Sequence, residues 1–324
     1  MKENTVRKTF LWGVVVLGVI ALWAVIIASL LSKKTDDAPV VVNLPTLTPV
    51  ATLAATEPPT EAPQSEPTPL PDRFGVFTDG EVVATENEYR TKDVAVFFSM
   101  VQEDRNQITG RRLTYYIADV YVRQTEDLRC GLANGNLHDR ISMREISQSH
   151  NAIVALSGDF AAWRRTGLCV RNGEVFREVS DRKRDVGVLL SDGRLITYEV
   201  GAYDAQDLLA LNPWHAWSFG PALLTEDGQS KERFNSNVNS TSARAVFGYY
   251  EPGHYCLIIV CRDIFRSEGM HLKELSRFVR QLGCKAAYNM DGGRTAHLYW
   301  NGEVYASSNG SRPVNDIIYI GGQM

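Results

Sequence analysis

The sequence predicts an α+β domain with a mixed β-sheet and a few helices, behind a single N-terminal transmembrane helix. From residue 72 onward, short runs rich in Val, Ile, Tyr and Phe alternate with Gly, Asn and Asp turns, which is typical of strands. Segments with helical periodicity are few and lie scattered among these runs. Residues 9–31 are almost wholly apolar and uncharged, and a helix of that length crosses a bilayer core of roughly 30 Å.

Charge around the apolar run predicts its orientation. Three basic residues precede the run and two follow it, but Asp36 and Asp37 dilute the far side. Basic residues favour the cytoplasmic side, so residues 1–34 are predicted to be a cytoplasmic stub and an uncleaved anchor in the cell membrane, with the C-terminal part outside. A cleaved signal peptide is the rival, but the run is long for one and no clear Ala-x-Ala site follows.

Composition divides the remainder into two parts. Residues 35–71 are rich in Pro, Thr, Ala and Glu and predict an extended linker, and residues 72–324 predict one extracytoplasmic domain. The net charge of −4 shows no basic excess, so no nucleic-acid partner is expected. The 5 cysteines include no Cys-x-x-Cys pair, so the sequence does not suggest zinc.

The predicted domain starts with two strands at 94–100 and 113–122, a helix at 138–149 and a buried strand at 152–156. Two more helices are predicted at 204–211 and 269–283, and a hairpin turn is predicted at Asn301-Gly302. Further strands are predicted at 168–171, 186–190, 195–200, 217–224, 243–250, 255–260, 286–288 and 317–320.

Two aspartates follow buried strands. Asp159 comes after the strand at 152–156, and Asp291 comes after the strand at 286–288, followed by Gly292 and Gly293. Two carboxylates that converge on one cleft would suit acid–base or nucleophilic chemistry at a sugar carbon. Adjacent glycines let the backbone approach a ligand closely, and Asn289 adds an amide. The alternative is an Asp-Gly-Gly hairpin turn whose carboxylate only accepts from backbone donors.

Two arginines form a second group of candidates. Arg244 lies inside an apolar strand and Arg312 precedes the last strand. An arginine in an apolar run needs an anion, which is either a bound phosphate or carboxylate or a partner in a structural salt bridge. The hydroxyls of Ser157 and Thr295 are further candidates for ligand binding. No cofactor is indicated with certainty, and a divalent cation held by Asp159 and Asp291 stays open.

Five blocks in order resemble the phosphodiester glycosidase family over roughly residues 151–322. The family's Gly-Asp aspartate falls on Asp159, its strand arginine on Arg244, its Asp-Gly-Gly aspartate on Asp291 and its late arginine on Arg312. Ser157 stands where the family commonly has Asn, and Arg294 and Thr295 stand where it commonly has Gly and Ser, which bears on substrate identity. The blocks are Ala-Leu-Ser-Gly-Asp-Phe (155–160), Ser-Phe-Gly-Pro-Ala-Leu (218–223), Ala-Arg-Ala-Val-Phe-Gly (243–248), Leu-Gly-Cys-Lys-Ala-Ala-Tyr-Asn-Met-Asp-Gly-Gly (282–293) and Ser-Arg-Pro-Val-Asn-Asp (311–316).

The resemblance implies a hydrolase that cleaves a sugar-1-phosphodiester, with arginines on the phosphate and aspartates at the sugar. Bacterial members are often labelled exopolysaccharide-biosynthesis proteins, so the implied substrate is a cell-envelope or exopolysaccharide glycan, reached from the bilayer anchor at 9–31. Two alternatives remain. One is a non-catalytic module that binds an anionic wall polymer without hydrolysing it, and the other is a tethered scaffold whose Asp and Arg residues form only a buried salt-bridge network.

Overall fold

The computed structural model of this chain describes residues 74–263, 267–306 and 310–322. The predicted membrane span at 9–31 and the predicted linker at 35–71 lie outside these residues. Within the described part of the chain, no helix is both long enough and apolar enough to cross a bilayer.

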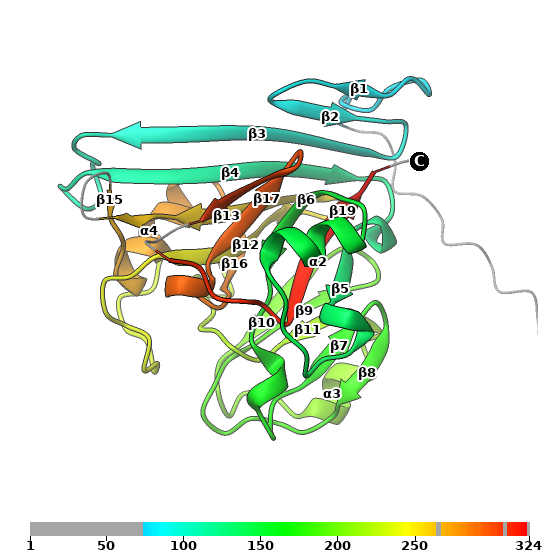
Figure 1. Cartoon of the computed structure of the whole chain (residues 1–324). Helices are drawn as coiled ribbons and strands as arrows, with labels where there is room; N and C mark the ends of the chain where they lie inside the picture. The colour runs from blue at the N-terminus through cyan, green and yellow to red at the C-terminus, as the bar shows by residue number, and fades with distance from the viewer. Residues whose placement is uncertain (1–73, 264–266, 307–309, 323–324) are drawn as a thin grey trace, which may run out of the picture. The chain divides into compact units, whose positions relative to one another are not determined.

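Strands dominate the described residues, and they form three larger sheets and one two-stranded ribbon (Figure 1). In spatial order the first sheet comprises β1 (Val83–Ala84), β2 (Glu88–Arg90), β3 (Val94–Glu103), β4 (Leu113–Val122), β13 (His254–Val260), β12 (Arg244–Glu251) and β16 (Ala286–Asn289). The second comprises β18 (Glu303–Ala306), β17 (His297–Trp300), β6 (Ala152–Ser157), β19 (Asp316–Gly321) and β5 (Arg129–Leu132). The third comprises β10 (Leu195–Tyr198), β9 (Val186–Leu190), β11 (Pro213–Trp217), β7 (Cys169–Arg171) and β8 (Glu174–Arg177), and the ribbon pairs β14 (Arg262–Asp263) with β15 (Ser267–Glu268).

The prediction of a sheet-rich domain with few helices is confirmed, but the prediction of a mixed sheet is wrong. Every strand pair among the described residues is antiparallel. Parallel neighbours need a crossover of about a dozen residues or more, usually a helix. Here β3 and β4, β12 and β13, and β17 and β18 are joined directly as hairpins, so each strand returns beside the one before it.

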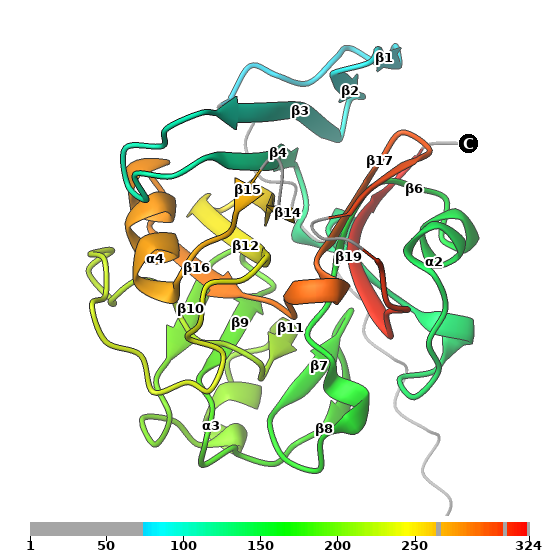
Figure 2. The same ribbon diagram turned by 60° about the vertical axis from the view of Figure 1, so that its left-hand side comes forward.

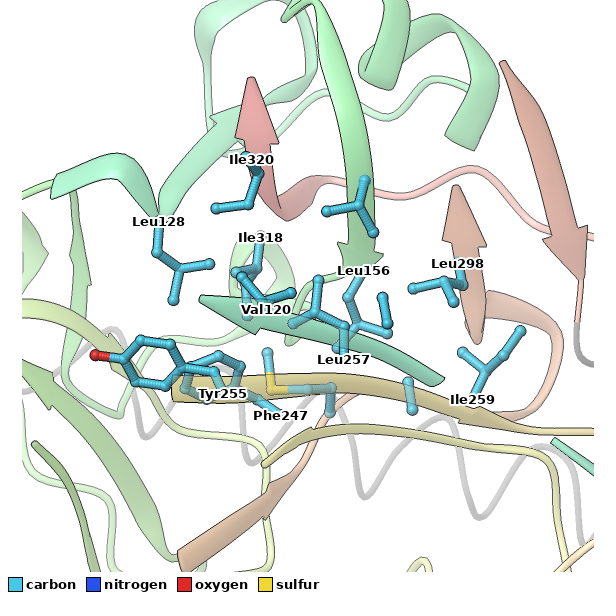
Figure 3. Packing of buried hydrophobic residues seen from close by; sticks show 14 of the residues in the cluster. Val120, Leu128, Leu156, Phe247, Tyr255, Leu257, Ile259, Leu298, Ile318 and Ile320 are labelled. Carbon is cyan, nitrogen blue, oxygen red and sulfur yellow. The ribbon is translucent and has the colours of Figure 1, made fainter. Parts of the chain in front are cut away.

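The first two sheets pack face to face. Leu156, Leu298 and Ile318 of the second sheet meet Leu257 and Ile259 of the first in a continuous apolar layer (Figure 3). Helix α4 (Leu272–Gln281) covers the outer face of the first sheet, and helix α2 (Met143–Ser149) covers the outer face of the second (Figure 2). Both faces of each sheet are therefore buried over their central strands.

The third sheet carries its own small core, to which helix α3 (Ala205–Leu209) contributes. Leu168, Val186, Val188 and Leu208 are among its members. Tyr288 of β16 packs against Gly187 of β9, so close that a Cβ at Gly187 would lie 2.8 Å from the ring. This contact joins the third sheet to the first beside the end of β16.

Most predicted elements are confirmed within a few residues, and two are corrected. The predicted helix at 138–149 begins only at Met143, because Ser142 and Glu145 form a capping box there. Ile141, before the cap, pairs with Val314 instead. The predicted strand at 217–224 is also wrong. Strand β11 ends at Trp217, and the chain then turns through Gly220, whose φ of 70° is left-handed.

Candidate active site

Two strand ends meet at this site, but the two aspartates that follow them do not converge on one cleft, because Asp159 lines neither of the two cavities that Asp291 lines. Strand β6 of the second sheet ends at Ser157 and strand β16 of the first ends at Asn289, and the Asp291 amide donates to the Gly158 carbonyl at 3.1 Å. Gly158 is required at this junction, because a Cβ there would lie 2.1 Å from Oδ1 of Asp316. Residues from both halves of the sandwich thus meet at one point.

Asp159 lies inside a buried ion-pair network. Nη2 of Arg171 donates to its Oδ1 at 2.7 Å, and the Ser218 amide donates to its Oδ2 at 2.9 Å. Nε of Arg171 also donates to Asp316 Oδ2 at 2.9 Å, and all three charged residues are only 1% exposed. Nη1 of Arg164 lies 3.8 Å from Asp159 Oδ2. Two carboxylates and two guanidinium groups therefore neutralise one another away from water.

This pairing limits what Asp159 can do. Both of its carboxylate oxygens already accept hydrogen bonds, and two cations lie beside it. These surroundings do not suit a further cation, so they do not fit a divalent metal held by Asp159 and Asp291, which the sequence left open. No group of three or more His, Cys, Asp or Glu side chains with metal-binding geometry occurs within the described ranges.

Asp291 has different surroundings. It is only partly buried and lines two cavities, one with Arg244 and one with Ser157. Burial raises the pKa of its carboxyl to about 6, although the nearby Thr295 hydroxyl and the charge of Arg164 act to lower it. A carboxyl with a pKa close to neutral pH at the wall of a cavity is suited to proton transfer.

Arg244 lines the larger of these cavities, which has a volume of about 220 Å³ and is called the Arg244 cavity below. Its Nε donates to the Met270 carbonyl at 3.0 Å and its Nη2 to the Ser240 carbonyl. Within the described part of the chain, no carboxylate forms an ion pair with this guanidinium, which is 2% exposed. Burial lowers its pKa to about 10, so it stays charged at neutral pH.

Strand register explains why Arg244 and Asp291 share this cavity. Val246 of β12 pairs with Asn289 of β16, and continuing the antiparallel register by two residues sets Arg244 opposite Asp291. The Gly293 amide then donates to the Ala243 carbonyl at 3.0 Å.

The pairing of β12 with β16 explains why glycine occupies both positions after Asp291. A Cβ on Gly292 would lie 2.8 Å from the Ala243 carbonyl oxygen, and Gly293 has a left-handed φ of 63°. The sequence predicts that these glycines let the backbone approach a ligand closely. In the structure they lie close to the Ala243 backbone beside β12, and both also line the Arg244 cavity.

Asn289 adds an unpaired acceptor to the same cavity. Its Nδ2 donates to the Gly220 carbonyl at 2.8 Å, which orients the amide. Its Oδ1 is buried and has no hydrogen-bond partner among the described residues. Buried polar atoms are nearly always paired, so this oxygen is suited to accept from a ligand hydroxyl or amide.

Ser157 and Thr295 line the smaller cavity with Asp291. Ser157 Oγ accepts from the His297 amide at 3.2 Å, and the Thr295 hydroxyl donates to the Gly292 carbonyl at 2.7 Å. The volume is about 10 Å³, roughly what one water molecule needs. Both hydroxyls therefore serve the local structure and also border a water-sized space beside Asp291.

Arg312 is not brought to either cavity. Its side chain is exposed, and its backbone amide donates to the Arg294 carbonyl at 2.8 Å. Of the nine predicted site residues, the other eight converge on the two cavities or on the ion-pair network between the sheets.

Several residues of the site were not predicted from the sequence. Arg171 and Arg164 hold Asp159, Asp316 completes the network, and the ring of Phe219 lines the Arg244 cavity. A signal for Arg171 existed, because it closes the apolar stretch Leu168-Cys169-Val170, as Arg244 lies in an apolar strand. No local pattern marks Phe219 or pairs Arg171 with Asp316.

This geometry defines a cavity that offers one cation, one carboxyl of raised pKa and one unpaired amide oxygen, as expected of an enzyme that binds an anionic, hydroxyl-bearing substrate. The sequence pattern of the phosphodiester glycosidase family matches residues 150–321, slightly more than half of the chain, and the chain belongs to that family. Family membership supports a glycosidase-type hydrolytic function. No curated protein matches the chain in sequence.

A solved structure with a TM-score above 0.5 shows a similar fold. The catalytic domain of zebrafish N-acetylglucosamine-1-phosphodiester alpha-N-acetylglucosaminidase, auto-inhibited by its pro-peptide, aligns with a TM-score of 0.56 and 16% identity, over 75% of this chain and 88% of that chain. A hypothetical protein from Synechocystis aligns with a TM-score of 0.46 and 14% identity, over 71% of this chain and 62% of that chain.

Proposed function

We propose that this chain hydrolyses the bond between an anomeric sugar carbon and a phosphodiester oxygen, with Arg244 on the phosphate and ionised Asp291 activating water. One observation carries the proposal. A buried guanidinium without a carboxylate partner in the described ranges and a carboxyl of pKa about 6 line the same cavity of about 220 Å³.

The phosphate explains why Arg244 would need no acidic partner. A phosphodiester carries one negative charge and its oxygens match the donor geometry of a guanidinium. When the sugar–oxygen bond breaks, a second charge develops on the phosphate, and a fixed cation stabilises it. Because the second pKa of a phosphate monoester is about 6, this leaving group needs little help from a general acid.

Asp291 would act as the base. Above pH 6 its carboxylate is mostly ionised, and the water-sized space between Ser157, Thr295 and Asp291 lies beside it. A water there gives its proton to Asp291 as its oxygen bonds to the anomeric carbon. The carbon–oxygen bond to phosphate breaks, and the electron pair stays on the phosphate oxygen near Arg244. The products are the free sugar and the phosphate monoester.

The hydrogen bonds that Asp159 already accepts favour a single displacement, in which water attacks the anomeric carbon directly. The two oxygens of Asp159 accept from Arg171 and the Ser218 amide. Asp316, which also borders the smaller cavity, is paired with Arg171, so Asp291 is the carboxylate at these two cavities that has no ion-pair partner among the described residues. A double displacement needs a nucleophile and a separate acid–base group, whereas direct attack by water needs only the base. We therefore expect inversion at the anomeric carbon. Asn289 Oδ1 would accept from a sugar hydroxyl or acetamido N–H.

The proposal extends to the location of the protein. The apolar run at residues 9–31 would anchor the chain in the membrane, and residues 35–71 would hold the domain on the outer side. The substrate would then be a phosphodiester-linked glycan of the cell envelope or an exopolysaccharide. The sequence alone supports this part, and fractionation of cells that express the full-length chain would test it.

The test of activity uses the full-length chain and a methyl phosphodiester of N-acetylglucosamine linked through its 1-position, supplied as each anomer. We expect release of free sugar, unchanged by EDTA, and a first-formed anomer of inverted configuration by proton NMR. The Asp291→Asn variant should release sugar at least about a hundredfold more slowly. Saturable binding of several such diesters without release from any of them would instead support the non-catalytic binding module.

A further inference from the structure

A second cavity borders the Arg244 cavity and differs from it in size and charge. It has a volume of about 490 Å³ and shares Phe219, Asn237 and Val238 with the Arg244 cavity. Arg164, Arg182, Lys183 and Arg184 all line it, and we call it the basic cleft. Nothing in the proposed hydrolytic step uses these four cations.

Two of these four cations, Arg182 and Lys183, have no carboxylate partner among the described residues. Both side chains are exposed. Arg184 pairs with Asp181 at 2.9 Å, but Asp181 does not line the cleft. The carboxylate that does, Asp185, accepts from the Val200 and Ala222 amides and lies 4.0 Å from Lys231. The cleft is thus electropositive.

Arg164 links the cleft to the buried network. Its Nη1 donates to the Ser218 carbonyl at 2.6 Å and its Nη2 to the Asp159 carbonyl at 2.8 Å, while its guanidinium lies 4.8 Å from the centre of the Phe219 ring. These contacts fix one cation of the cleft to the scaffold that also positions the candidate active site. A ligand on Arg164 would therefore be held at a defined distance from Asp291.

Aromatic side chains form another part of the wall. Trp163 is 60% exposed, which is unusual for the largest apolar side chain, and Phe160 is stacked with it at 6.3 Å between ring centres. Phe160 itself has a left-handed φ of 60°, a strained conformation for a bulky residue directly after Asp159. The Arg140 guanidinium lies over the Trp163 ring, 4.9 Å from its centre, and the aromatic surface that stays exposed is suited to pack against the apolar face of a sugar ring.

We propose that the basic cleft binds an anionic saccharide segment of the substrate that continues beyond the cleaved phosphodiester. The chain would then act on an oligomer or polymer with repeated phosphate or carboxylate groups rather than on an isolated sugar phosphodiester. This inference rests on the proposed function for its placement along the substrate. The shared wall at Phe219 favours a saccharide over a nucleic acid, since it makes the cleft continuous with the candidate sugar site.

The test compares charge reversal inside and outside the cleft in the full-length chain. The cleft variant is Arg182→Glu with Lys183→Glu. The matched control is Arg105→Glu with Lys273→Glu, which changes the net charge equally at two exposed residues away from both cavities. The long substrate is a tetramer of N-acetylglucosamine joined through 1-phosphodiesters, and the short one is the methyl phosphodiester.

We expect the cleft variant to raise KM for the tetramer by about tenfold or more, because it removes two phosphate contacts and adds repulsion. Its kcat/KM for the methyl diester should stay within about twofold of the parent. Arg182 and Lys183 do not line the Arg244 cavity, and both are solvent-exposed, so salt screens their charges. The control variant should change neither value. An equal change for both substrates, or for both variants, would overturn the inference.

A binding experiment separates this inference from the hydrolytic proposal. Fluorescence anisotropy with a fluorescein-labelled tetramer measures affinity for the chain carrying Asp291→Asn, so no turnover is needed. Cleft reversal should weaken binding about tenfold, and neutral chitotetraose should bind far more weakly than the tetramer. Unchanged binding after cleft reversal, or equal affinity for an oligothymidylate of the same charge, would contradict a saccharide cleft even if hydrolysis is observed.

Discussion

Asp159 and Asp291 follow two buried strands and meet at one junction, yet their surroundings are opposite. Asp159 is 1% exposed and accepts from Arg171 and the Ser218 amide, whereas Asp291 lines two cavities and its pKa rises to about 6. The two arginines differ in the same way. Arg171 bridges two carboxylates, whereas Arg244 donates to two backbone carbonyls and has no carboxylate partner in the part of the chain that the structure describes.

The difference indicates that the charged groups of this site have two separate roles, one structural and one in contact with a ligand. A buried ion pair that is fully formed fixes the positions of the segments that carry it, because removing either partner leaves the other charge buried and unpaired. A buried charge that is left unpaired by the protein is costly unless a ligand supplies the partner. On this reasoning we infer that the Asp159–Arg171–Asp316 network holds the strand ends together, and we propose Arg244 and Asp291 as the groups that meet substrate.

The largest expected effect separates the two aspartates. Asp291→Asn should lower kcat by about 10²–10⁴-fold, the usual contribution of a general base. Burial raises the folded-state pKa of Asp291 above its ordinary value of about 3.9, so ionisation costs the folded state stability as pH rises from about 4 to 6. At pH 8 the variant should therefore unfold at a temperature no lower than the parent.

Asp159→Asn provides the contrast in the same assays. It should lower the unfolding temperature, because Arg171 loses a charged partner in a site 1% exposed. The assignment of a structural role to Asp159 and a catalytic role to Asp291 would be contradicted if Asp159→Asn abolished turnover with no loss of stability while Asp291→Asn kept its activity.

A second large effect is expected on stability alone. Arg171→Met should cost about 3–5 kcal/mol in the free energy of unfolding, because it leaves buried Asp316 without its cation and Asp159 with only Arg164 at 3.8 Å. Urea denaturation followed by tryptophan fluorescence would measure the loss. Adding Asp159→Asn and Asp316→Asn to the same chain should recover part of it, and an additive further loss would show that the three residues are not one network.

A smaller effect, on binding and on turnover, is expected at Arg244. Arg244→Ala should raise KM for the methyl phosphodiester by about 10–100-fold, which corresponds to a charged hydrogen bond worth about 1.5–3 kcal/mol. It should also lower kcat, because the charge that develops on the leaving phosphate loses its cation. Arg244→Lys should restore only part of the binding, because an ammonium keeps the charge but loses the two-pronged donor geometry. A parent-like KM in Arg244→Ala would remove this residue from the phosphate site.

The smallest effect is expected at Arg312, which the family resemblance also placed on the phosphate. Its side chain is exposed and lines neither cavity, so Arg312→Ala should leave kcat and KM within about twofold of the parent. Steady-state kinetics on the methyl diester would check this. A loss as large as that of Arg244→Ala would mean that the two arginines act together in the complex.

The sequence predicted the strands well because their signals are local. Apolar runs and turn residues mark β6, β12, β13 and β16, and the two aspartates stand directly after two of them. The start of α2 was misjudged because Ile141 has the right spacing for a helix but pairs with Val314, far away in the sequence. Local periodicity cannot show a tertiary contact that ends an element.

The site was predicted less completely than the fold for the same reason. Arg171 and Asp316 are 145 positions apart, so their ion pair has no local signature. The role of each aspartate also depended on these partners, which only the packing of two sheets brings together. The basic cleft combines the charged run at 182–184 with Arg164 and with aromatic residues from other segments. The run alone is typical of a solvated surface, so it does not predict a cleft.

The central claim is that ionised Asp291 acts in the chemical step, and the pH dependence of kcat/KM for the methyl phosphodiester tests it most directly. The account predicts that the rate rises with pH through an apparent pKa of about 6 and then levels off, because the carboxylate must be free of its proton. The residual rate of Asp291→Asn should lack this rise. A rate that falls above pH 6, or the same rise in Asp291→Asn, would contradict the assignment.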